Sequence, residues 1–127
     1  SQIAEGLLKK MGGDRFDVHS AGMEPAVEID PLAIQVMGEA EIDISEQWPK
    51  SVRAYLGRAW FQHVFIVCEE GELACPRFFM GTTHVLTWPT PDPAKAGGSE
   101  EERLAAFRET REQIRSRLVS WLKENPQ

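Results

Sequence analysis

The apolar run at 63–67 constrains the fold of this chain more than any other segment. Four consecutive apolar residues follow His63, and Cys68 comes directly after them. A near-continuous apolar run of this kind is typical of a strand that is buried on both faces of a parallel sheet. A further strand is predicted at 83–88, and a shorter one with alternating apolar and polar residues at 15–20.

Helical patterns lie around these strands. Asp30 and Pro31 together indicate a helix start, because Asp caps a helix and Pro suits the first helical position. Ser99 and Glu102 have the spacing of a capping box, and a stripe of apolar residues follows them, so a long helix is predicted at 99–124. Helices that alternate with strands predict an α/β fold in three layers, with a mainly parallel sheet and flanking helices.

Size and composition limit what the chain can do. Its 127 residues suit one domain, which we expect to span 1–127. A net charge of −6 argues against a nucleic-acid partner, and the longest apolar run is too short to cross a membrane. Two cysteines do not suggest a disulfide-stapled secreted domain, so we expect a cytoplasmic protein. His19, His63 and His84 are scattered, and no zinc site is predicted.

The two cysteines lie at the end of the apolar run. Cys68 ends this strand, and Cys75 stands seven positions later, directly before Pro76. A short polar loop between them allows the two thiols to meet as a disulfide, and Gly71 gives that loop freedom. Spacing alone leaves two interpretations open: a redox pair, or two unrelated thiols of which one is a small core residue.

Other strand ends carry polar residues. Ligands of open α/β sheets bind outside the carboxyl ends of the strands. Ser20, Ala21 and Gly22 end the first predicted strand, and Asp92 and Pro93 follow the last one. An Asp-Pro pair is by itself a common turn, so Asp92 is either a turn residue or a functional acid.

Taken in order along the chain, these features resemble the low-molecular-weight phosphotyrosine phosphatase superfamily, and most closely its thioredoxin-coupled arsenate reductases. The opening residues 1–6 resemble the stretch just after the phosphate-binding loop of that superfamily, in which a Cys is followed by five residues, Arg and Ser. The segments 20–22, 68–75 and 92–93 follow in the matching order. The resemblance implies a phosphotyrosine phosphatase I-like fold. Residues 94–98 are Ala, Lys, Ala, Gly and Gly, where the phosphatases usually carry aromatic residues, and this difference favours the reductase branch.

The resemblance also implies roles for individual residues in a disulfide cascade that reduces arsenate to arsenite. Ser1 corresponds to the last residue of the oxyanion loop, and Asp92 to the general acid. Cys68 attacks the loop cysteine after that cysteine has bound arsenate, and Cys75 resolves the product. Thioredoxin then reduces the disulfide between Cys68 and Cys75. The implied partners are therefore an arsenate-like or phosphate-like oxyanion and thioredoxin, in arsenical resistance.

An alkali ion is the one cofactor that the resemblance raises. In some arsenate reductases the equivalents of Glu5 and Ser20 help to hold a potassium ion near the catalytic loop. A further carboxylate that this site needs aligns with Ser51 in this chain. No other cofactor is expected.

The catalytic loop itself is not found in the 127 residues. Six residues after Cys68 stands Ala74, and six after Cys75 stands Gly81, where the loop would require Arg. We expect this chain alone to be inactive and the first central strand to be missing from it. Either these residues are an incomplete part of a longer protein, or a homodimer, a swapped element or a rearranged sheet compensates for the missing strand. The alternatives are a low-molecular-weight protein tyrosine phosphatase and a catalytically dead binding or regulatory domain.

Overall fold

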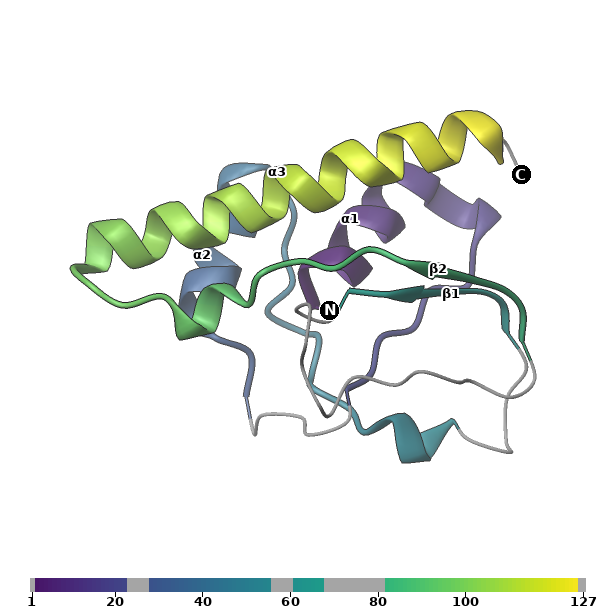
Figure 1. The fold of residues 1–127 in the computed structure, drawn as a ribbon, viewed down its shortest axis with the longest axis horizontal. Coiled ribbons are helices and arrows are strands. Elements are labelled where there is room, and N and C mark those ends of the chain that lie inside the picture. Colours follow the sequence, from purple (N-terminus) through teal and green to yellow (C-terminus); the bar gives the residue numbers. More distant parts are fainter. Residues whose placement is uncertain (1, 23–27, 56–60, 68–81, 126–127) are drawn as a thin grey trace.

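The computed structural model describes residues 2–22, 28–55, 61–67 and 82–125. Its elements in chain order are α1 (Gln2–Gly12), η1 (Gly13–Arg15), α2 (Pro31–Glu39), η2 (Val52–Ala54), β1 (Phe61–Ile66), β2 (Thr82–Thr87), η3 (Pro93–Lys95) and α3 (Glu100–Glu124). In Figure 1, the long helix α3 extends across α1 and α2, and the two strands run side by side next to them. None of the helices in the described ranges is long and apolar enough to cross a membrane.

Side-chain caps explain where two of the helices begin. Asp30 has extended backbone, and its carboxylate accepts a hydrogen bond of 2.9 Å from the Leu32 amide at the start of α2. At the start of α3, the Ser99 hydroxyl accepts from the Glu102 amide at 3.1 Å, and the Glu102 carboxylate accepts from the Ser99 amide at 3.2 Å. Both predicted helix starts are confirmed.

The Ser99 cap is expected to contribute measurably to stability. Ser99→Ala leaves the Glu102 amide without its side-chain acceptor, so the free energy of unfolding should fall by about 1 kcal/mol. Ser99→Asp keeps an acceptor at this position and should restore most of the loss. Urea unfolding followed by circular dichroism measures both changes. An alanine variant as stable as the unchanged protein would contradict the importance of this cap.

The sheet is parallel, as predicted. β1 and β2 are paired in parallel, with Phe61 opposite Thr82 and Ile66 opposite Thr87. β1 begins two residues before its predicted start, and β2 begins one residue before its own. Because both run in the same direction, their carboxyl ends lie at one edge of the sheet, where the segments toward Cys68 and Asp92 leave it. The α/β class with helices beside a parallel sheet is confirmed.

The strand predicted at 15–20 is not a strand in the structure. Arg15 ends the 3-10 helix η1, and Phe16 has extended backbone with φ −131° and ψ 143°, but no ladder includes 16–20. An alternating pattern favours extended backbone, whereas a strand also requires a neighbouring chain that pairs with it. Among the described residues, the pairing near this segment is a single parallel bridge between Gly22 and Ser51.

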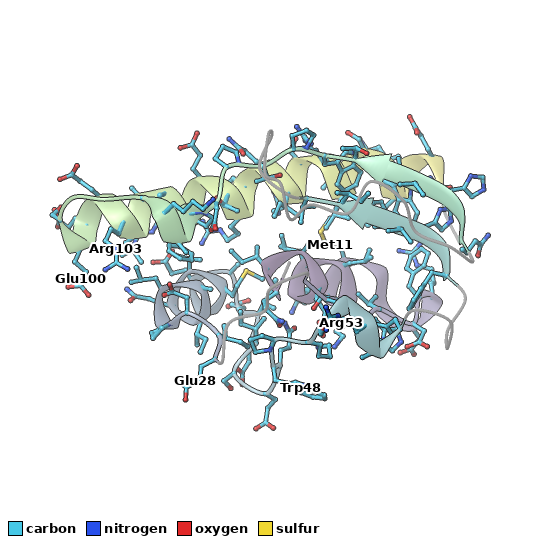
Figure 2. The ribbon with its side chains drawn as sticks, turned by 60° about the horizontal axis from the view of Figure 1, so that its bottom comes forward. Met11, Glu28, Trp48, Arg53, Glu100 and Arg103 are labelled. Carbon is cyan, nitrogen blue, oxygen red and sulfur yellow. The ribbon has the colours of Figure 1, made fainter. Side chains whose placement is uncertain are left out.

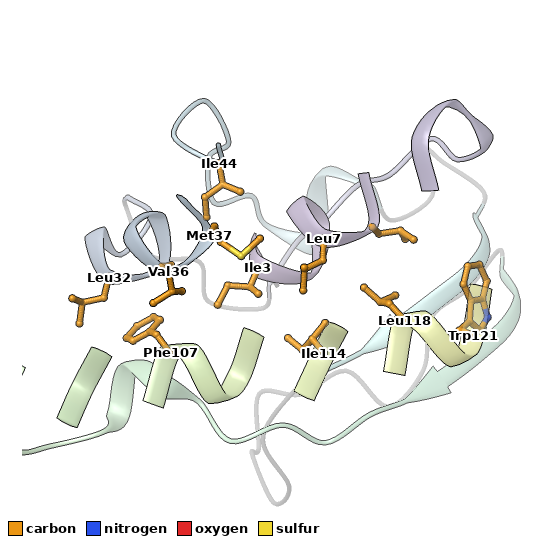
Figure 3. Close-up of a cluster of buried hydrophobic side chains, with 12 residues drawn as sticks. Ile3, Leu7, Leu32, Val36, Met37, Ile44, Phe107, Ile114, Leu118 and Trp121 are labelled. Atoms are coloured by element: carbon orange, nitrogen blue, oxygen red, sulfur yellow. The ribbon is translucent and has the colours of Figure 1, made fainter. Parts of the chain in front are cut away.

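The core lies between α3 on one side and α1 and α2 on the other (Figure 3). The buried cluster combines one face of each helix with Ile44 from the chain after α2: Ile3, Leu7, Leu8, Leu32, Ala33, Val36, Met37, Ile44, Phe107, Ile114, Leu118 and Trp121. Gly6 permits a close approach within it, because a Cβ at this position would lie 2.6 Å from Ile44 Cγ2. This packing holds α1 against the chain that follows α2.

The tryptophans differ in their burial. Trp121 is buried and packs edge-on against Phe65, with ring centroids 5.0 Å apart. Trp88 packs on the same Phe65 ring at 4.6 Å. Trp48, however, is 64% exposed and projects from the side of the molecule opposite α3 (Figure 2). Trp60 lies outside the described residues.

Candidate functional site

The first turn of α1 carries a buried carboxylate, Glu5. Only 4% of its side chain is exposed. One carboxylate oxygen, Oε2, accepts a hydrogen bond from Lys9 Nζ at 2.5 Å, and the other, Oε1, accepts from the Ser20 hydroxyl. The structure therefore brings together the two residues, Glu5 and Ser20, that the sequence assigned to one ion site.

A third partner of Glu5 comes from a distant part of the chain. Lys50 Nζ lies 3.5 Å from Glu5 Oε1, and 15% of the Lys50 side chain is exposed. The same ammonium donates a hydrogen bond of 2.9 Å to the Trp48 carbonyl oxygen and lies 4.6 Å from the centre of the Trp48 ring. Lys50 thus has a carboxylate, a carbonyl and an aromatic face around its charge.

The pKa of Glu5 reflects these partners. Burial raises the pKa of this carboxyl, because a buried charge loses its hydration. The hydrogen bonds from Lys9 and Ser20 and the charges of Lys50 and Lys9 outweigh burial, and the pKa lies below its ordinary value. Glu5 is therefore ionised at neutral pH, and its negative charge is compensated within the protein.

Backbone pairing positions Lys50 next to Ser20. The Gly22 amide donates a hydrogen bond of 2.8 Å to the Lys50 carbonyl oxygen, and Gly22 and Ser51 form a parallel bridge. The segment that ends in Ser20, Ala21 and Gly22 thereby runs beside the segment that contains Lys50. Three separate parts of the chain meet at Glu5.

Potassium does not fit this arrangement. Alkali and other hard cations bind oxygen ligands, and the oxygens available here include the Glu5 carboxylate, the Ser20 hydroxyl and the Trp48 carbonyl. Both Glu5 oxygens already accept hydrogen bonds, and Lys50 Nζ lies between Glu5 Oε1 and the Trp48 carbonyl oxygen. A potassium ion at these oxygens would lie against the Lys50 ammonium.

Asp92 occupies a turn at the sheet edge. Its carboxylate accepts a hydrogen bond of 3.0 Å from the Ala94 amide and caps η3, and its side chain is exposed. The Trp88 amide donates to the Ile66 carbonyl at 2.8 Å, so the segment that leads to Asp92 is attached to the last residue of β1. The turn and the functional interpretation of Asp92 are compatible, because the capping hydrogen bond from the Ala94 amide goes to Oδ1, one of the two carboxylate oxygens.

The other predicted site residues lie outside the described residues. Ser1, Cys68 and Cys75 belong to this group. Cys68 nevertheless follows the described residue Val67 directly and stands two positions after the end of β1. β1 therefore ends, just ahead of Cys68 in the sequence, at the edge of the sheet from which the chain to Asp92 also departs.

Sequence reasoning missed two sets of contacts. Lys9 stands four residues after Glu5 in α1, and this spacing could have identified the pair. Lys50 carries no such signal, because it is 45 residues from Glu5.

The second set is an imidazole pair across the sheet. His63 and His84 are opposite each other in the β1–β2 register and stack with ring centroids 5.1 Å apart. Burial, and then the neighbouring His84, lower the pKa of His63. Within the described ranges, no three metal-binding side chains gather around this pair or elsewhere.

Comparisons with known proteins identify the family. The model of the low molecular weight phosphotyrosine protein phosphatase family matches residues 1–126, and the chain belongs to this family. Over 126 residues it is 39% identical to an arsenate reductase of Oceanobacillus iheyensis, with 97% of this chain and 86% of the relative covered.

Solved structures agree with this assignment. An arsenate reductase in the phosphate binding state matches with a TM-score of 0.78 and 28% identity, over 98% of this chain and 88% of that one. A thioredoxin-dependent arsenate reductase of Corynebacterium glutamicum matches with a TM-score of 0.57 and 29% identity, over 94% of this chain and 54% of the other. These matches confirm the predicted phosphatase-like fold and the resemblance to arsenate reductases.

Proposed function

We propose that this protein acts in the reduction of arsenate to arsenite by a cysteine disulfide cascade. The observation that supports this function best is the position of the cysteine pair in a chain related to arsenate reductases. β1 ends two positions before Cys68 in the sequence, and β2 ends five positions before Asp92, and both strands end at the shared carboxyl edge of a parallel sheet. Open α/β sheets bind their ligands at this edge.

The proposed chemistry transfers two electrons from thiols to arsenic. The thiolate of a Cys-x5-Arg loop, which ends at the position of Ser1 in the family pattern, bonds to arsenic and displaces an oxygen. Asp92 donates the proton with which that oxygen leaves as water. The Cys68 thiolate then attacks the loop sulfur, the sulfur–arsenic bond breaks, and its electron pair reduces arsenic(V) to arsenic(III).

The remaining steps return the thiols to their reduced state. The Cys75 thiolate attacks Cys68 and releases the loop cysteine, so the product is a disulfide between Cys68 and Cys75. A dithiol such as that of thioredoxin reduces this bond and is itself oxidised. We infer thioredoxin as the partner and the cytoplasm as the compartment, in which such dithiols are kept reduced.

The Cys68–Cys75 pair can be tested in the 127-residue chain itself. Mild oxidation should produce an intrachain disulfide between these two residues, and reduced thioredoxin should remove it. Peptide mass mapping after alkylation identifies the link. Cys68→Ser and Cys75→Ser should each abolish the link, because a disulfide needs both sulfurs. Two thiols that stay free under oxidant, in a folded protein, would contradict the proposed cascade.

The activity requires a loop ahead of Ser1. A protein that carries a strand and a Cys-x5-Arg loop joined to this chain should turn over arsenate with thioredoxin, whereas the 127 residues alone should not. The same protein assayed with an aryl phosphate distinguishes a tyrosine phosphatase. Hydrolysis of the aryl phosphate without thioredoxin-dependent arsenate turnover would favour the phosphatase, and a protein inactive in both assays would favour a binding domain.

A further inference from the structure

We propose that Lys50 supplies, at the Glu5–Ser20 site, the positive charge that a potassium ion supplies in some arsenate reductases, so that this protein needs no alkali ion there. The site joins three segments through Glu5 in α1, Ser20 before the Gly22–Ser51 bridge, and Lys50 after Trp48. Its cation is therefore a part of the chain.

The contacts of the Lys50 ammonium resemble those of a bound cation. Nζ lies 2.9 Å from the Trp48 carbonyl oxygen and 3.5 Å from Glu5 Oε1, and the Trp48 ring provides a third, aromatic contact. A carbonyl and a carboxylate oxygen are the kinds of ligand that a hard cation takes. The ammonium donates a hydrogen bond to the carbonyl oxygen, forms an ion pair with the carboxylate and is covalently tethered to the chain.

The position of the ammonium is held by the surrounding structure. The Lys50 carbonyl accepts from the Gly22 amide at 2.8 Å, which fixes the backbone from which the side chain reaches Glu5. Gln2 also donates to the Trp48 carbonyl oxygen, at 3.1 Å, so that this oxygen is shared between α1 and Lys50. The Lys50 ammonium is thus positioned by contacts within the chain and not by a bound ion.

Charge balance argues in the same direction. Glu5 carries one negative charge, and the ammonium groups of Lys9 and Lys50 both lie within 4 Å of its oxygens. A potassium ion would be a third positive charge beside a single carboxylate and would be repelled by both lysines. Lys9 is less suited than Lys50 to take the place of the ion beside Glu5, because half of its side chain is exposed to solvent and its charge is hydrated.

Thermal unfolding in matched salts tests the proposal. The unchanged chain should melt at the same temperature in potassium chloride, sodium chloride and choline chloride of equal ionic strength. Lys50→Met keeps the length and apolar stem of the side chain but leaves Glu5 without this cation. The variant should melt about 3–6 °C lower in choline chloride, and potassium should restore the loss in a saturable manner.

Two further variants separate this effect from general changes of charge. Lys50→Arg keeps a cation and should remain indifferent to potassium. Lys9→Met removes the other lysine at Glu5, yet should also show no response to potassium, because Lys50 still fills the site. The readout is stability, so the outcome does not depend on whether the protein reduces arsenate.

Two results would overturn the proposal. One is a saturable, potassium-specific rise in the melting temperature of the unchanged chain, which would show that an ion binds despite Lys50. The other is a folded Lys50→Met variant that potassium does not stabilise beyond choline. If Lys50→Met does not fold, the unchanged chain and Lys50→Arg still test the proposal. Potassium-specific stabilisation of either protein would refute the role of the lysine.

Discussion

Asp92→Asn is expected to lower arsenate turnover by about 100- to 10,000-fold in a protein that carries a Cys-x5-Arg loop ahead of this chain. The asparagine has no proton to donate to the departing oxygen, whereas its side-chain oxygen can still accept the 3.0 Å hydrogen bond from the Ala94 amide. The turn that starts η3 should therefore persist. Initial rates of thioredoxin-coupled arsenate reduction measure the loss.

A matched turn elsewhere provides the control for Asp92. Asp43 is also exposed, and its carboxylate accepts a hydrogen bond of 2.9 Å from the Ser45 amide in a similar turn. Asp43→Asn should leave turnover unchanged, and melting temperatures should show that both asparagine variants are folded. Activity of Asp92→Asn within about threefold of the unchanged enzyme would contradict the general-acid role, since a lost proton donor costs far more.

Leu118→Ala should lower the free energy of unfolding by about 2–5 kcal/mol. Leu118 is only 2% exposed and belongs to the cluster between α3 and the two shorter helices (Figure 3). Truncation removes buried methyl groups and leaves a cavity whose walls lose their contacts. Because most domains are stable by only about 5–15 kcal/mol, this single change should remove a large part of the total.

The adjacent residue Arg117 offers a control on the same helix. Arg117 is exposed, and alanine is a good helix former, so Arg117→Ala should change the free energy of unfolding by less than about 0.5 kcal/mol. Urea unfolding monitored by circular dichroism compares the two variants. Equal stabilities would mean that α3 does not pack on the core through Leu118.

Much of the secondary structure could be predicted because its causes are local. The caps at Asp30 and Ser99 act on amides two and three residues away, so a short stretch of sequence contains the whole interaction. The apolar run at 63–67 predicted a parallel strand from its composition alone. The strand and its direction are confirmed, but Ile66 is the one residue of β1 that is buried. The order of the cysteine pair and the Asp-Pro pair along the chain indicated the family, because that order is a property of the sequence itself.

Tertiary structure decided the rest. The segment 16–20 has the pattern of a strand, but pairing with a neighbour is not a property of the segment itself, and no ladder forms there in the structure. Likewise, His63 and His84 stack only because the register of β1 and β2 places them opposite each other.

The Glu5 site shows this division most clearly. Sequence resemblance paired Glu5 with Ser20, and helical spacing relates Glu5 to Lys9. Lys50 lies 45 residues from Glu5, and the Gly22–Ser51 bridge brings it to within 3.5 Å of the carboxylate. Local sequence specifies caps and periodicity, whereas contact between distant charges depends on how separate segments pack, and only the folded chain contains that information.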